Sequence, residues 1–162
     1  MAQYTTIRTN TLGLATGTLN MGLDIAITKK LSIDVSGYWN PISVPGLRLR
    51  TLGAFIGIRR WRFEPHVGFF WGMHFFCARY RVGNRYTRYN GYLLGPGVSA
   101  GYSWMWSRRW NFSLEGGVGI FYMNDTKWYP DTSPLDNNIV MKHYHRFVLA
   151  PSKLEISFSY LF

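Results

Sequence analysis

Apolar and polar residues alternate along the last nine positions of the chain. One face of this segment carries Leu154, Ile156, Phe158, Tyr160 and Phe162. The other face carries Glu155, Ser157 and Ser159, and only Leu161 breaks the alternation. A period of two residues predicts a β-strand with one apolar and one polar side. The segment is therefore predicted to be a strand that ends the chain on an aromatic residue and meets different surroundings on its two faces.

The same period recurs upstream and predicts eight strands. Seven of them are expected near Thr5–Leu14, Leu19–Thr28, Leu31–Trp39, Leu47–Arg59, His66–Tyr80, Gly91–Trp104 and Trp110–Met123, before the C-terminal strand. Short turns are expected at Lys29-Lys30, Trp61–Pro65 and Ser107–Arg109, and longer loops at Asn40–Gly46, Gly83–Asn90 and Asn124–Tyr144. Because Pro96 cannot donate a hydrogen bond to a neighbouring strand, it predicts a local bulge in the sixth strand.

Two features favour a closed barrel that crosses a membrane. Short turns and longer loops alternate, which is the pattern of outer-membrane barrels with periplasmic termini. Aromatic residues fall at two levels, as expected for girdles at membrane interfaces: Trp39, Trp104, Trp106, Trp110, Tyr122, Tyr160 and Phe162. We therefore predict one all-β domain over residues 1–162, an eight-stranded antiparallel up-and-down transmembrane β-barrel in the bacterial outer membrane.

Composition agrees with this prediction. Aromatic residues make up 18% of the chain, and Gly accounts for 17 of the 162 residues, which suits short strands and tight turns. The chain has no run of 18 apolar residues, so no transmembrane helix is predicted. The N-terminus lacks the basic and apolar regions of a signal peptide, so we expect a mature form from which the signal has been removed. The single cysteine, Cys77, rules out a disulfide framework.

The net charge of +10 raises the possibility of nucleic-acid binding, but no nucleic-acid motif is present. Basic residues such as Arg59-Arg60 and Arg108-Arg109 fall at predicted strand ends and turns. A basic rim is expected at the loops, formed by Arg79, Arg81, Arg85, Arg88, Lys142 and Arg146. Such residues would meet the phosphates of lipid headgroups or lipopolysaccharide rather than nucleic acid.

Charged residues also fall within the predicted strands. Four acids lie on polar faces, namely Asp24, Asp34, Glu115 and Glu155, and Arg8 lies on the first strand. Because charges facing lipid are costly, these side chains are expected to point inward. We predict a buried network in which Arg8 meets Glu155, Asp24 and the other acids. A proton or ion path is the functional alternative, whereas a catalytic pair of acids would have no substrate access inside a filled lumen.

The last loop holds the candidates for other chemistry. His143 and His145 have a spacing at which two histidines share a metal, although a solvated loop is the simpler interpretation. Ser133, Asp136 and His143 define the alternative of a lipid-modifying enzyme at the outer rim. A soluble carrier with an apolar lumen, as in lipocalins, is a third possibility. We predict no enzyme activity, no cofactor and no metal.

Several segments in this order resemble a Bacteroidota family of unknown function. They are Arg8–Asn10, Leu19–Asp24, Lys29–Asp34, Tyr38–Pro41, Gly95–Tyr102, Arg109–Glu115, Ala150–Lys153 and Tyr160–Phe162. The family consists of small outer-membrane barrels, often encoded near fimbrillin genes, with no catalytic residues established. The resemblance implies eight strands and the outer membrane. The expected function is a structural or interaction scaffold without an open pore, whose basic extracellular loops contact lipopolysaccharide, fimbriae or a larger membrane complex.

Overall fold

The computed structural model describes residues 5–44, 47–84, 88–128 and 142–162, with side chains except at 43–44, 47–49, 84, 88, 127–128 and 142–144. Its elements are β1 (Thr5–Asn10), α1 (Thr11–Ala15), β2 (Leu19–Thr28), β3 (Leu31–Asn40), β4 (Ser43–Val44), β5 (Leu47–Trp61), β6 (Gly68–Asn84), β7 (Arg88–Met105), β8 (Trp110–Trp128) and β9 (Lys142–Leu161). No helix in this part of the chain is long and apolar enough to cross a membrane.

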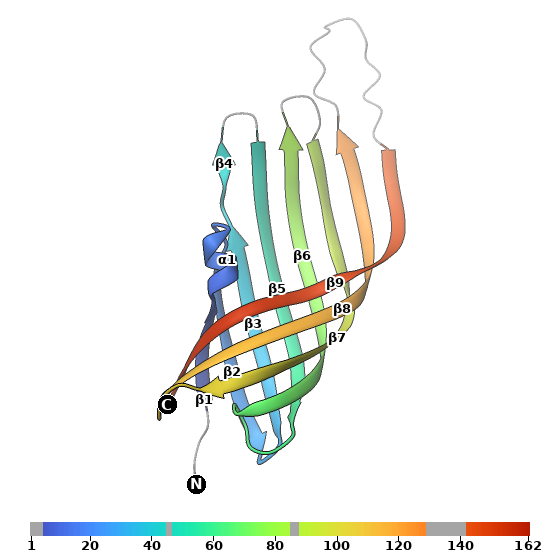
Figure 1. The fold of residues 1–162 in the computed structure, drawn as a ribbon. Coiled ribbons are helices and arrows are strands. Elements are labelled where there is room, and N and C mark those ends of the chain that lie inside the picture. Colours follow the sequence, from blue (N-terminus) through green and yellow to red (C-terminus); the bar gives the residue numbers. More distant parts are fainter. Residues whose placement is uncertain (1–4, 45–46, 85–87, 129–141) are drawn as a thin grey trace, which may run out of the picture.

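The strands form one antiparallel sheet that closes into a ring (Figure 1). Except for β3 and β4, each strand pairs with the next along the chain; β1 also pairs with β9, and β3 pairs with β5. The two-residue strand β4 adds a small extension to β5. Eight strands thus make the ring, which confirms the predicted all-β, eight-stranded antiparallel fold.

The wall of the ring is uneven in height. Strands β2 and β3 have 10 residues each, whereas β5 to β9 have 15 to 20. Figure 1 shows these longer strands rising well above β1 and α1. β1 begins and β9 ends at the same end of the ring, since Thr6 pairs with Leu161. We call this the turn end and the opposite one the loop end.

The outer face of the wall is apolar and the inner face is polar, which is the reverse of the arrangement in water-soluble proteins. Ile25, Val118 and Phe158 are 48%, 54% and 36% exposed on the outside, whereas Asp24 and Glu115 are 1% and 2% exposed inside. Alternation along each strand produces this sorting, because successive side chains point to opposite faces. The prediction that the apolar faces of the strands point outward and the mid-strand acids inward is confirmed.

Several predicted boundaries were wrong, chiefly at the loop end. β1 stops at Asn10, whose side chain accepts hydrogen bonds from the backbone N–H groups of Leu12 and Gly13 and so caps α1. β6 begins at Gly68 rather than at His66, because His66 has a φ of 67°. β6 to β9 extend into what was predicted as loops, with Asn124 pairing with His145.

The bulge expected at Pro96 is not found. Pro96 stays in register opposite Phe75, and the register between β7 and β8 is the same on both sides of it. A Cβ at the preceding Gly95 would collide with the carbonyl oxygen of Ile120. The backbones of β7 and β8 therefore lie close together here and keep their register, although Pro96 has no N–H group to donate. A shift occurs instead on β9, where Ser152 is the extra residue opposite β8.

Because the strands approach closely at Gly95, a single added methyl group there should lower the free energy of unfolding markedly. Gly95→Ala should destabilise the ring by about 1–3 kcal/mol, because the strands must move apart to admit the new Cβ. Gly116→Ala is the matched control on the neighbouring strand, where no atom lies within 4 Å of the position that the new Cβ would take. Urea unfolding of both variants in detergent measures the difference, and equal unfolding free energies would contradict the packing at Gly95.

Candidate functional site

The centre of the ring holds a group of buried charged side chains that we call the interior network. Its cations are Arg8, Arg59 and Lys153, and its acids are Asp24, Asp34, Glu115 and Glu155. All seven are at most 5% exposed. They come from six strands of the ring, β1, β2, β3, β5, β8 and β9, so the network joins walls that are far apart in the sequence.

Arg8 connects three strands. Its Nη1 donates a hydrogen bond to Oε2 of Glu155 at 2.6 Å, and its Nη2 donates to both carboxylate oxygens of Asp34 at 2.5 and 2.6 Å. Glu115 lies 3.6 Å away. The planar guanidinium suits such multiple contacts, because its N–H donors point in fixed directions.

Arg59 makes a second set of contacts from β5. Its Nη1 donates to Oδ2 of Asp24 at 2.5 Å, and its Nη2 donates to Oε2 of Glu115 and lies 3.2 Å from Oδ2 of Asp34. Ser99 donates a further hydrogen bond to Glu115 at 2.7 Å. The two arginines therefore share Asp34 and Glu115.

Lys153 completes the network. Its Nζ lies 2.9 Å from Oδ2 of Asp34, 3.1 Å from Oε1 of Glu115 and 4.0 Å from Oε1 of Glu155. Tyr38 donates a hydrogen bond to Glu155. Asp34 thus meets all three cations, and each charged group in the interior network has a partner of opposite charge, as buried ions require.

Aromatic rings close the interior on both sides of the network. Toward the turn end lie Trp61, His66 and Phe70, with ring centroids 4.6 to 5.5 Å apart. Toward the loop end lie Phe55, Phe76 and Phe121, at 4.1 to 5.8 Å. The guanidinium of Arg59 lies 5.0 Å from the Phe70 centroid, and Nζ of Lys153 lies 5.6 Å from that of Phe55.

Little space remains between these groups. The hollow between Arg8, Arg59, Trp61 and His66 has a volume of about 10 Å³. This is at the lower limit for a single water molecule. The described side chains thus fill the centre of the lumen, as expected for a ring of only eight strands.

The structure brings together all five residues predicted for the lumen, but sequence reasoning missed two of the cations. Asp24 pairs with Arg59 rather than with Arg8. In the sequence Arg59 stands next to a basic turn. Ile56 and Ile58 face outward, and since successive side chains point to opposite faces, Arg59 must face inward. The same rule applied to Lys153, two residues before Glu155, would have identified it.

The predicted basic rim is only partly described. Arg79 and Arg81 are exposed on β6, and Arg146 is exposed on β9, 3.1 Å from Oδ2 of Asp125. All three lie on strands, and β6 continues to Asn84, past the predicted strand end at Tyr80. The side chains of Arg85, Arg88 and Lys142 lie outside the described residues.

The predicted aromatic girdles fall on the outer face. At the turn end the rings of Trp110, Tyr160 and Phe162 follow one another at centroid distances of 5.1 and 5.0 Å. Trp104 and Trp106 are exposed nearby on the outside. At the loop end Trp39 is 53% exposed, and Tyr122 is half-buried against His145.

The candidates for other chemistry lie mostly outside the described residues. Nδ1 of His145 shares a hydrogen bond of 2.8 Å with the hydroxyl of Tyr122. Ser133, Asp136 and the side chain of His143 lie outside the described residues. Within those residues, no cluster of three or more His, Cys, Asp or Glu side chains could hold a metal ion.

Fold and site together define a class: a closed eight-stranded antiparallel ring with a network of buried charged residues at its centre. Over residues 1–162 the chain matches the family described as protein of unknown function (DUF3575), and it belongs to that family. The expectation of a family of unknown function is thereby confirmed. No curated protein and no solved structure matches the chain.

The interior network predicts that two adjacent arginines differ sharply in their effect on stability. Arg59→Gln should cost about 3–5 kcal/mol, because it leaves buried carboxylates without their partner. Arg60→Gln, on the exposed face one residue later, should change the unfolding free energy by less than about 0.5 kcal/mol. Urea unfolding in detergent measures both.

A charge-compensating variant separates the lost ion pair from general damage. Adding Asp24→Asn to Arg59→Gln should recover part of the lost stability, because one unpaired carboxylate is then removed. Additive losses in the double variant would contradict the pairing of these two residues.

Proposed function

We propose that this chain is a membrane-spanning β-barrel of a bacterial outer membrane, which acts as a structural or interaction scaffold rather than as a pore. The observation that carries the proposal is the outward-facing apolar belt. On β5 this belt includes Leu52, Ile56 and Ile58, which are 63%, 57% and 52% exposed. Water-soluble monomers rarely expose a continuous apolar surface of this kind.

The height of the belt also supports a membrane. Outward-facing arginines border it on β5, with Arg50 at the loop end and Arg60 at the turn end. The ten-residue step between them covers about 33 Å along the strand. At the usual tilt of barrel strands this corresponds to about 25 Å, the height of the apolar band in outer-membrane barrels.

The filled lumen supports a scaffold over a channel or a carrier. The interior network and the aromatic layers leave a hollow of only about 10 Å³ near Arg8, whereas a lipocalin-like carrier needs an apolar lumen with room for a ligand. Interactions would then fall to the outer face and the loops. The resemblance to Bacteroidota barrels encoded near fimbrillin genes supports lipopolysaccharide, fimbriae or a larger membrane complex as partners, with the termini in the periplasm.

Membrane insertion is tested by one charge at the middle of the belt. Val118→Arg should impair insertion into lipid vesicles, because an arginine facing lipid at the midplane costs about 2–4 kcal/mol. Phe63→Arg is the control, since Phe63 is 67% exposed in the turn before β6, beyond the belt. Vesicle flotation measures insertion of both variants and of the wild type.

Equal insertion of the two variants, or a folded protein that stays in solution without lipid, would contradict the proposed membrane location. The inserted wild type should give no steady ion-selective openings in planar bilayers. Regular openings at each insertion would contradict the closed interior.

The interaction role predicts a stoichiometric companion in pull-downs from native outer membranes in mild detergent. A variant with residues 129–141 replaced by a short glycine-rich turn should lose that companion if the longest loop makes the contact. The barrel should still insert, because the strands that form the ring are retained. Recovery of the barrel alone from native membranes would leave it a free-standing protein and argue against a scaffold for a larger complex.

A further inference from the structure

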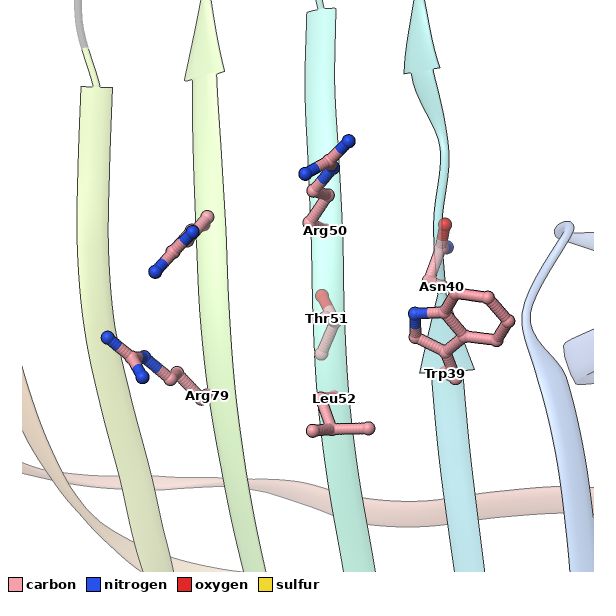
Figure 2. A pocket seen from close by; sticks show the side chains of 7 residues that line it. Trp39, Asn40, Arg50, Thr51, Leu52 and Arg79 are labelled. Atoms are coloured by element: carbon pink, nitrogen blue, oxygen red, sulfur yellow. The ribbon is translucent and has the colours of Figure 1, made fainter.

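The outer face carries a group of arginines that the interior network does not use. Arg50 on β5 and Arg79 and Arg81 on β6 line an external hollow of about 160 Å³ together with Trp39 and Leu52. Figure 2 shows Arg50 and Leu52 on one strand, with Arg79 and Trp39 on the strands to either side. We call this group the arginine hollow.

The register of the strands holds these like charges together. Arg50 pairs directly with Arg81, and Leu52 pairs with Arg79 two positions closer to the belt. Directly opposed residues on one face of a sheet have Cβ atoms about 5 Å apart, and like charges in such positions destabilise the pairing. The direct opposition of Arg50 and Arg81 is therefore unfavourable for the pairing of β5 with β6.

No acid within the described ranges relieves this repulsion. None of the three arginines takes part in an ion pair there, although Arg146 at the same end pairs with Asp125. Three guanidiniums around a shallow hollow are complementary to a phosphate group, which accepts paired N–H donors from arginine.

An apolar groove adjoins the arginine hollow on the side of the belt. It has a volume of about 490 Å³ and shares Leu52 and Arg79 with the hollow. The small residues Ala54 and Cys77 form part of its lining, and Tyr92 and Leu94 contribute from the next strand. A groove that begins at arginines and continues into an apolar belt matches a ligand with an anionic head and an acyl chain.

From this geometry we propose that the arginine hollow binds a phosphate of a lipid A-type headgroup in the outer leaflet, with one acyl chain in the adjoining groove. The inference rests on the proposed membrane-spanning barrel, which places Arg50, at the loop-end border of the belt, at headgroup level. Trp39 lies at the same level, where aromatic side chains are favoured. The site lies on the wall of the barrel and does not depend on the extracellular loops.

The test compares two sets of three arginines in protein inserted into nanodiscs of zwitterionic lipid. Titration with bisphosphorylated lipid A should show at least tenfold weaker binding for the variant with Arg50→Gln, Arg79→Gln and Arg81→Gln. The control variant with Arg60→Gln, Arg62→Gln and Arg108→Gln removes the same charge at the turn end, where the side chains are exposed. Its affinity should stay within twofold of the wild type.

Two further arms identify the ligand chemistry. Dephosphorylated lipid A should bind the wild type about as weakly as bisphosphorylated lipid A binds the loop-end variant. Ala54→Phe, which narrows the groove without changing charge, should weaken binding several-fold. Equal weakening by both sets of arginines, or equal affinity for the dephosphorylated lipid, would overturn the proposal.

Thermal unfolding provides a second test that does not depend on detecting lipid binding directly. Without lipid A, Arg81→Gln should raise the thermal unfolding midpoint, because it removes the opposition to Arg50. Bisphosphorylated lipid A should then raise the midpoint of the wild type more than that of the variant. The reverse order would overturn the proposal. Failure of the wild type to insert into vesicles would instead disprove the membrane-spanning barrel itself, so the two failures are distinguishable.

Discussion

The contact of Asp34 with three cations is the interaction around which the interior is built. Arg8, Arg59 and Lys153 reach this carboxylate from β1, β5 and β9, at 2.5 to 3.2 Å. Each of these ions is removed from water and is tolerated only because its partners are in place. Partners in the network are separated by as many as 147 residues, so the network can form only when the ring has closed. Closure of the ring and pairing of its buried charges must therefore occur together.

That condition also decides what the interior can do. Ion pairs in the middle and aromatic layers around Phe70 and Phe55 fill a ring that is narrow because it has only eight strands. We propose that an interior filled in this way passes no ions and holds no ligand. Recognition would then use the outer surface, where apolar side chains form the belt and arginines border it. In the described part of the chain, the arginine hollow brings arginines that have no ion pair next to an apolar groove on this surface.

Much of the fold follows from local pattern. The alternation in Leu19–Thr28 and Leu31–Asn40 led to strand limits that agree with the structure to within one residue, because the turn at Lys29-Lys30 marks both ends. The loop ends were predicted poorly, since β8 and β9 pair beyond Met123 through polar residues that carry no periodic signal. Arg59 was placed at the end of a predicted strand and grouped with the neighbouring basic residues, although its alternation with the outward-facing Ile56 and Ile58 places it inside.

By itself, the sequence determined the number of strands, their direction and which side chains face inward, because these depend on a two-residue period and on turns that are local. Tertiary structure alone decided which charges pair, since Asp24 meets Arg59 through the register of several strands and the closure of the ring. It also decided that Arg50 and Arg81 face each other, because that juxtaposition depends on the register between β5 and β6. Register is a property of paired strands and cannot be read from either strand alone.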